Sequence, residues 1–220
     1  MRLGALMRGW NWGLRLLGYG ALVLVVNAMM GQAVAQTRIL ALGDSLTAGY
    51  GLPAGQGFAD QLEAALKAKG YDVRVLNAGV SGDTTSGGLA RLDWALADEP
   101  QIAIVELGAN DGLRGLDPEL TYRNLDQILT RLQAKGIAVV LAGMLAPPNY
   151  GKPYAEQFRE VYRRLAARHQ VVFYPFFLDG VAGQPGLNQP DGIHPTREGV
   201  AVIVERMLPV VAKVLEGGKG

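Results

Sequence analysis

The chain has 220 residues, no cysteine and a formal net charge of +1, from 21 basic and 20 acidic side chains. The lack of cysteine excludes disulfide bonds, a thiol nucleophile and thiolate metal sites. A charge so close to neutral gives no electrostatic reason to expect a protein that binds nucleic acid.

The first 35 residues differ in composition from the rest of the chain. They contain three arginines and no acidic residue, and only Asn27 interrupts the apolar character of residues 16–30. Residues 33–35 then read Ala-Val-Ala, a small-x-small pattern. A basic start, a short apolar stretch and such a site are typical of a secretory signal peptide. The alternative is a membrane anchor, but a spanning helix needs about 20 apolar residues.

We therefore expect residues 1–35 to form a signal peptide that is cleaved between Ala35 and Gln36. Residues 36–220 are expected to form one domain, because their number suits a single hydrophobic core. This part of the chain carries 18 basic and 20 acidic side chains, a formal charge of −2.

Short apolar runs and longer amphipathic segments alternate along residues 36–220. The expected strands are 38–43, 73–76, 102–107, 137–142 and 171–174. Each is followed by an expected helix, and these helices are 58–69, 85–97, 118–135, 154–169 and 195–215. This alternation predicts an α/β fold in which a five-stranded parallel sheet carries helices on both faces.

Polar, glycine-rich segments follow the first three expected strands. They read Gly-Asp-Ser at 43–45, Asn-Ala-Gly-Val-Ser-Gly-Asp at 77–83 and Gly-Ala-Asn-Asp-Gly at 108–112. In open parallel sheets, ligands bind beyond the carboxyl ends of the strands. We expect these three segments to meet at one rim of the sheet and to form the functional site there.

Ser45 is a candidate nucleophile, although a serine at the start of a helix also serves as an ordinary cap. Asp191 and His194 favour the catalytic interpretation, because a serine nucleophile needs a base and the base needs an orienting acid. At this spacing the carboxylate reaches one ring nitrogen, which leaves the other to accept the serine proton. The second histidine, His169, is expected to face solvent at a helix end.

Acyl transfer also requires hydrogen-bond donors for a negatively charged oxygen. The main-chain N–H groups of Ser45 and Gly82 and the side-chain amide of Asn110 are the candidates. Taken singly, the segments around Gly82 and Asn110 are ordinary turns.

The segment 144–151 follows the fourth expected strand and reads Met-Leu-Ala-Pro-Pro-Asn-Tyr-Gly. Its apolar residues and its tyrosine would suit the lining of an acyl groove, with Leu145 and Tyr150 as substrate-binding residues. The alternative is an ordinary proline-rich connection between a strand and a helix.

Four blocks of sequence resemble those of the SGNH (GDSL-type) hydrolases. They are Gly43-Asp44-Ser45-Leu46, Gly82, Gly108-x-Asn110-Asp111 and Asp191-x-x-His194, and they occur in that order. Residues 105–115 are similar to the bacterial periplasmic thioesterase I/lysophospholipase/arylesterase branch. The resemblance extends over nearly all of residues 36–215.

The resemblance implies a flavodoxin-like, three-layer α/β/α fold and a Ser45–His194–Asp191 triad. It implies that Ser45, Gly82 and Asn110 form the oxyanion hole of an enzyme without a cofactor. No metal is expected to be required, because the chain has no cysteine and only two histidines, of which His194 is already assigned as the base. The expected substrates are small acyl esters, thioesters and lysophospholipids. The exported chain is expected to be a periplasmic monomer without a lasting membrane anchor or a nucleic-acid partner.

Two other functions fit parts of the sequence. A carbohydrate O-deacetylase would use the same catalytic residues and would differ in its acyl-chain preference. A flavodoxin-like binding module would hold a phosphate in the turns, but these glycine turns contain no lysine or arginine.

Overall fold

The computed structural model describes residues 36–217, and the predicted signal peptide lies outside the described residues. Five strands form one sheet in the order β2-β1-β3-β4-β5, and all neighbouring strands are parallel. The strands are β1 (Thr37–Gly43), β2 (Val73–Gly79), β3 (Ile102–Glu106), β4 (Ala138–Ala142) and β5 (Val172–Tyr174).

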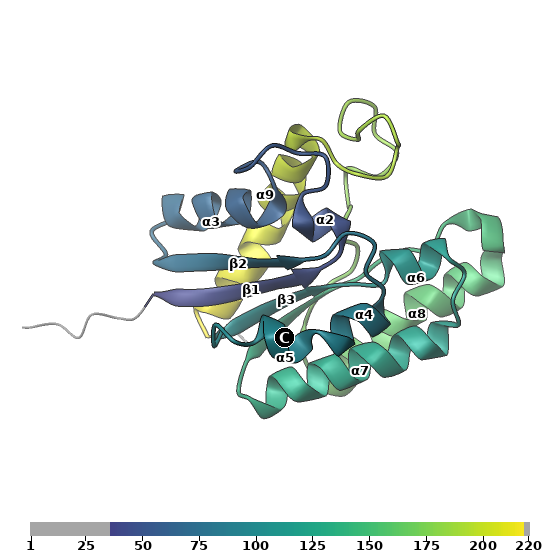
Figure 1. Cartoon of the computed structure of the whole chain (residues 1–220), viewed down its shortest axis with the longest axis horizontal. Coiled ribbons are helices and arrows are strands. Elements are labelled where there is room, and N and C mark those ends of the chain that lie inside the picture. The colour runs from purple at the N-terminus through teal and green to yellow at the C-terminus, as the bar shows by residue number, and fades with distance from the viewer. Residues whose placement is uncertain (1–35, 218–220) are drawn as a thin grey trace, which may run out of the picture. The chain divides into compact units, whose positions relative to one another are not determined.

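Helices cover both faces of this sheet (Figure 1). One face carries α3 (Phe58–Ala68) and α9 (Arg197–Leu215), and the other carries α4 (Thr85–Ala90), α5 (Leu92–Ala95), α7 (Pro118–Ala134) and α8 (Lys152–His169). The short helices α2 (Ser45–Ala48), α6 (Ala109–Leu113) and η1 (Pro148–Tyr150) lie in the connections that leave the strands. The predicted α/β/α architecture is confirmed.

The central strands form the core of the domain because both of their faces are covered by helices. All five residues of β3 are buried, and so are the last five residues of β1. The pairing register places Gly43 beside Gly79 on one side and beside Glu106 on the other. The carboxyl ends of three strands therefore lie in one row, and the glycine-rich segments leave the sheet together.

Three predicted helices differ from the structure. The helix expected at 154–169 begins two residues earlier, at Lys152. The helix expected at 85–97 divides into α4 and α5, because Arg91 leaves regular helical geometry and directs its side chain to Gly43 and Asp83. The helix expected at 195–215 begins at Arg197, where the Thr196 hydroxyl caps it.

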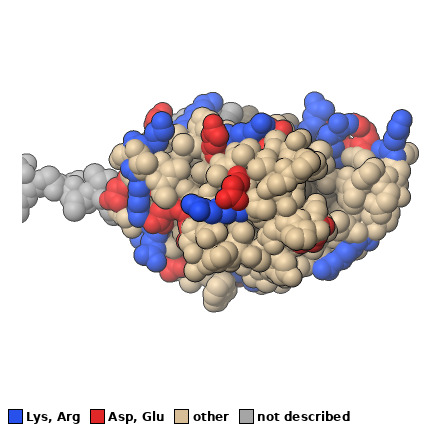
Figure 2. Space-filling model, turned by 90° about the horizontal axis from the view of Figure 1, so that it is seen from above, with Lys and Arg blue, Asp and Glu red and all other residues tan. Residues whose placement is uncertain are grey.

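The face of the molecule in Figure 2 shows basic and acidic side chains interspersed among uncharged ones. It therefore has no continuous surface of one charge, as the near-neutral composition leads one to expect. Within residues 36–217, no helix combines the length and the apolar character needed to cross a bilayer.

Candidate active site

Ser45 is the first residue of α2, directly after β1. The Asp44 carboxylate caps this helix by accepting the main-chain N–H of Leu46 at 3.0 Å. Gly43 permits the sharp turn, because a Cβ atom at this position would lie 2.0 Å from the Thr47 hydroxyl. The backbone therefore places Ser45 at the carboxyl end of the sheet with its side chain only partly buried.

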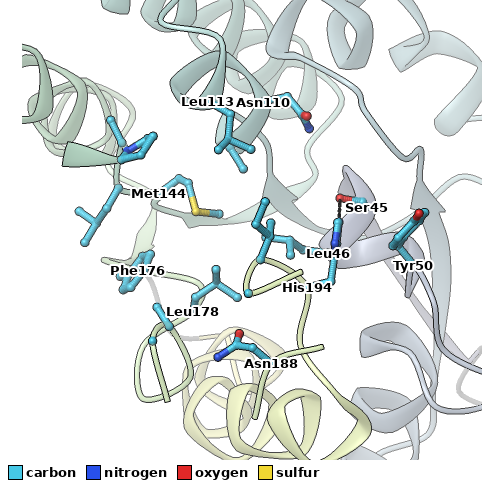
Figure 3. A pocket seen from close by; sticks show the side chains of 18 of the residues that line it. Ser45, Leu46, Tyr50, Asn110, Leu113, Met144, Phe176, Leu178, Asn188 and His194 are labelled. Atoms are coloured by element: carbon cyan, nitrogen blue, oxygen red, sulfur yellow. Dashed lines mark hydrogen bonds between the residues drawn. The ribbon is translucent and has the colours of Figure 1, made fainter. Parts of the chain in front are cut away.

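His194 reaches Ser45 from the loop that precedes α9. Its Nε2 atom lies 2.8 Å from the Ser45 hydroxyl (Figure 3). Its Nδ1 atom lies 2.6 Å from Oδ2 of Asp191. Pro195 pairs with Asn188 in an isolated bridge, which holds this part of the loop in an extended conformation. The three side chains can thus pass a proton from a hydroxyl to an imidazole that a carboxylate orients.

The Asp191 carboxylate accepts hydrogen bonds from the main chain of residues that follow it. Its Oδ1 atom accepts the main-chain N–H groups of His194 at 3.0 Å and Ile193 at 2.9 Å. The main-chain N–H of His194, with its ring and the Ile193 N–H, lowers the pKa of Asp191 to about 2. The group is therefore an anion at neutral pH and can hold the imidazole in one orientation.

The main-chain N–H groups of Ser45 and Gly82 are available to bind a ligand. Among the described residues, no hydrogen bond is donated by the main-chain N–H of Ser45 or of Gly82. Gly82 has a φ angle of 84°, which glycine adopts far more readily than other residues.

Asn110 lies across from Ser45 on α6 (Figure 3). Its amide nitrogen donates to the main-chain oxygen of Asp83 at 2.9 Å and to Oδ2 of Asp44 at 3.2 Å. These two acceptors hold the Asn110 amide in one orientation. A negatively charged oxygen near Ser45 would compete with Asp44 for one of these hydrogens.

A cavity of about 450 Å³ opens beside the Ser45 hydroxyl. Most of its wall is apolar, and polar groups gather where Ser45, Asn110 and His194 converge (Figure 3). The apolar wall includes Leu46, Leu113, Met144, Leu145, Phe176, Leu178 and Ile193. A cavity of this size and character suits a small ligand with an apolar chain.

The two residues predicted to bind substrate have different positions. Leu145 lines the cavity and is 44% exposed. Tyr150 is not among the lining residues, and its hydroxyl donates to the main-chain oxygen of Leu113 at 3.0 Å. Tyr150 therefore contacts a residue of the wall rather than the cavity itself.

Sequence reasoning missed a pair of buried carboxyl groups behind Ser45. Asp44 and Glu106 are both fully buried, and Glu106 accepts the Thr47 hydroxyl at 2.7 Å. Burial raises the pKa of Asp44 to about 6, against the lowering effect of the Leu46 and Asn110 donors. Burial, together with the charge of Asp44, raises the pKa of Glu106 well above its usual range.

Two other parts of the wall also escaped the sequence analysis. The Tyr50 ring packs on His194 with 4.5 Å between ring centroids, and the loop after β5 contributes Phe176, Leu178 and Asn188. No local pattern marked these residues, because the loops that carry them are irregular. These residues belong to the wall only because the fold brings their loops together at the carboxyl edge of the sheet.

The expectation that His169 faces solvent was wrong. Only 8% of its side chain is exposed, and its ring lies 2.7 Å from Asp126 and 2.9 Å from the side-chain oxygen of Gln133. The helix end packs against α7, so His169 joins two helices far from Ser45.

Comparisons with known proteins show the family to which the chain belongs. Residues 41–202 match the model of the GDSL-like lipase/acylhydrolase family. The chain is 44% identical over 197 residues to esterase TesA of Pseudomonas aeruginosa, an alignment that covers 89% of this chain and 96% of the relative. It is 40% identical over 177 residues to thioesterase 1/protease 1/lysophospholipase L1 of Escherichia coli, with 80% and 84% covered.

A crystal structure of TesA superposes with a TM-score of 0.76 at 44% identity, and the match covers 80% of this chain and 98% of that one. The predicted resemblance is confirmed over the domain, and with it the class of ester hydrolase. The chain belongs to the GDSL-like lipase/acylhydrolase family, the SGNH hydrolases.

Proposed function

We propose that this protein hydrolyses acyl esters and thioesters with Ser45 as nucleophile, His194 as general base and Asp191 as the acid that orients it. The observation that carries the proposal is the continuous chain of two hydrogen bonds from the serine through the imidazole to the carboxylate. A hydroxyl, an imidazole and a carboxylate are the groups that act as nucleophile, general base and orienting acid in such triads.

The reaction follows from these positions. The Ser45 oxygen attacks the acyl carbonyl while His194 Nε2 takes the hydroxyl proton, and the carbonyl oxygen becomes an anion. Collapse of this intermediate breaks the bond to the alcohol or thiol, which leaves with the proton held by His194. Water then attacks the acyl-serine and gives one proton to His194. The second tetrahedral intermediate collapses and releases the acid as His194 returns this proton to the Ser45 oxygen.

The anion is stabilised in this proposal by the N–H groups of Ser45 and Gly82 and by the Asn110 amide. The first two have no acceptor among the described residues, so a ligand oxygen adds bonds without breaking any. Asn110 must give up one acceptor. We assign that change to the bond with Asp44, because at 3.2 Å it is the longer of the two.

The apolar wall of the cavity supports the proposal that the enzyme recognises the acyl chain of its substrate. Leu145 and Met144 line it directly, and Tyr150 supports the wall through Leu113. Burial of each methylene contributes about 0.8 kcal/mol, so each added carbon raises kcat/KM about fourfold until the wall ends. The relatives named thioesterase and lysophospholipase favour thioesters and lysophospholipids as further substrates.

The cellular location and the oligomeric state of the enzyme are part of the same proposal. Residues 1–35 have the composition of a signal peptide, so we assign the processed enzyme to the periplasm, without a membrane anchor. We also propose that it acts as a monomer.

A panel of p-nitrophenyl esters from acetate to laurate, with an acyl-CoA, a lysophosphatidylcholine and an acetylated sugar, tests the substrate class. We expect kcat/KM to rise with chain length and then to level off. Leu145→Ala should move the plateau strongly and Tyr150→Phe slightly, while Trp94→Ala, at an exposed position on α5, should leave it unchanged. Preference for the acetylated sugar over every longer acyl group would favour the O-deacetylase instead.

A further inference from the structure

The turn that presents Gly82 is closed by hydrogen bonds at both ends. The N–H of Asp83 donates to the Val80 oxygen at 3.1 Å, and the N–H of Val80 donates to the Gly43 oxygen at 3.1 Å. A hydrogen-bonded turn with a positive φ at its third residue is typical of type II geometry. The direction of the Gly82 N–H is therefore set by how this turn is anchored.

The guanidinium group of Arg91 binds Gly43 and Asp83, the residues that hold the two ends of this turn. Nη2 of Arg91 donates to the Gly43 oxygen at 2.9 Å, and Nε of Arg91 donates to the Asp83 carboxylate at 2.6 Å. Both side chains of this ion pair are only 17% exposed. Charge-assisted hydrogen bonds of this kind are stronger and more directional than neutral ones, so the pair resists displacement of the turn.

The same ion pair also reaches the third proposed donor. Asp83, whose carboxylate Arg91 holds, accepts the Asn110 amide on its main-chain oxygen at 2.9 Å. Gly43, whose oxygen Arg91 binds, lies two residues before Ser45. A single side chain thus connects the segments that carry Ser45, Gly82 and Asn110.

The local backbone accommodates this contact. Helix α4 ends at Arg91, which breaks the helix and turns its side chain toward the rim. Gly87 leaves room for the Asp83 carboxylate, because a Cβ atom there would lie 2.3 Å from Oδ1. Arg91 is not among the residues that line the cavity, so it does not contact substrate.

We infer that Arg91, through its ion pair with Asp83, is a positioning residue that sets the geometry of the oxyanion hole. The inference rests on the proposed function, since the geometry matters only if Gly82 and Asn110 stabilise the anion. A displacement of about 1 Å in a reacting constellation can lower a rate about 10²-fold.

The test compares Arg91→Met, Arg91→Lys and Asp83→Asn with the wild type on p-nitrophenyl butyrate. We expect kcat per active site to fall about 10- to 100-fold in Arg91→Met, with KM within about threefold. Arg91→Lys should lie between this variant and the wild type, because a lysine keeps the charge but not the planar fork that binds two acceptors. The pH at half-maximal kcat should stay the same in all of them, since no residue of the triad changes.

Arg131→Met is the matched control. Arg131 forms an ion pair with Asp93, which joins α7 to α5 on the same side of the sheet but at a more exposed position. We expect this variant to keep the wild-type kcat. Titration of active sites with a fluorophosphonate and measurement of the unfolding temperature separate a loss of folded protein from a loss of kcat.

A merely structural role for Arg91 would lower the unfolding temperature or the active fraction and leave kcat per titrated site unchanged, which would overturn the inference. If Arg91→Met does not fold, wild-type kcat in both Arg91→Lys and Asp83→Asn overturns it equally. If the wild type shows no hydrolysis that depends on Ser45, the proposed function itself fails, and the two failures are thereby distinguished.

Discussion

His194 Nε2 lies 2.8 Å from the hydroxyl oxygen of Ser45, although 149 positions separate the two residues in the chain. The serine stands at the end of β1, and the histidine is held in the loop before α9 by the bridge between Asn188 and Pro195. The contact exists because the first strand and the last loop meet at the carboxyl edge of the sheet.

The two histidines should differ sharply in their effect on activity. His194→Ala should remove nearly all turnover, because no other described base reaches the Ser45 hydroxyl. His169→Ala should keep wild-type kcat but lower the free energy of unfolding by about 1–3 kcal/mol, since Asp126 and Gln133 lose a buried partner. Steady-state kinetics and urea unfolding of both variants check this, and the opposite pattern would contradict the assignment.

Asp191→Asn should lower kcat by about 10⁴-fold, the loss known for the corresponding change in serine proteases. The pKa of Asp191 is about 2 because the His194 N–H groups favour its anion, so this carboxylate stays charged wherever the imidazole is neutral. Titration of Asp191 should therefore not limit the wild-type activity at any pH well above about 2. A kcat within tenfold of the wild type in Asp191→Asn would show that orientation of the imidazole does not depend on this charge.

Asn110→Ala should lower kcat by about 10²–10³ and change KM little, because an oxyanion donor acts on charge that develops in the transition state. The change also removes the donor to Asp44 and Asp83, so the unfolding temperature must be measured alongside. Unchanged kcat with a raised KM would instead assign Asn110 to the binding of the ground state.

Glu106→Gln should stabilise the protein more strongly as the pH rises. The pKa of Glu106 lies well above its ordinary 4.5 because the group is buried beside Asp44. Folding therefore takes up a proton above about pH 4.5, and the free energy of unfolding falls as the pH increases. Glutamine keeps an acceptor for Thr47 without this proton uptake.

Urea unfolding at about pH 5 and about pH 8 measures the effect of Glu106. The gap in free energy of unfolding between Glu106→Gln and the wild type should widen with pH. A gap that is the same at both values would mean that Glu106 is not a source of pH dependence.

The sequence predicted the central strands well because they are continuous apolar runs. The edge strand β2, which contains Arg74 and Asn77, extends three residues beyond the expected 73–76. Residues 102–107 and 137–142 match β3 and β4 within one residue, since burial on both faces leaves few polar residues to blur the limits. The helix at 85–97 was harder to predict. The apolar spacing of Leu89, Leu92 and Leu96 continues through Arg91. The non-helical backbone of Arg91, whose side chain binds Gly43, nevertheless separates α4 from α5.

The candidate site was predictable where one short segment carries the chemistry. Asp191 and His194 are three residues apart, so their contact is local. Phe176 and Tyr50 were not predictable, because each contributes to the site only through a loop whose course the rest of the fold determines. The same holds for the burial of His169 against α7.

The most direct test of the account is mass spectrometry of the protein after reaction with a fluorophosphonate, combined with turnover of Ser45→Ala. We predict one phosphonyl adduct on the peptide that contains Ser45. We also predict a folded Ser45→Ala variant that forms no adduct and retains almost no esterase activity. An adduct on another residue, or turnover by Ser45→Ala within a few-fold of the wild type, would contradict the assignment of Ser45 as the nucleophile.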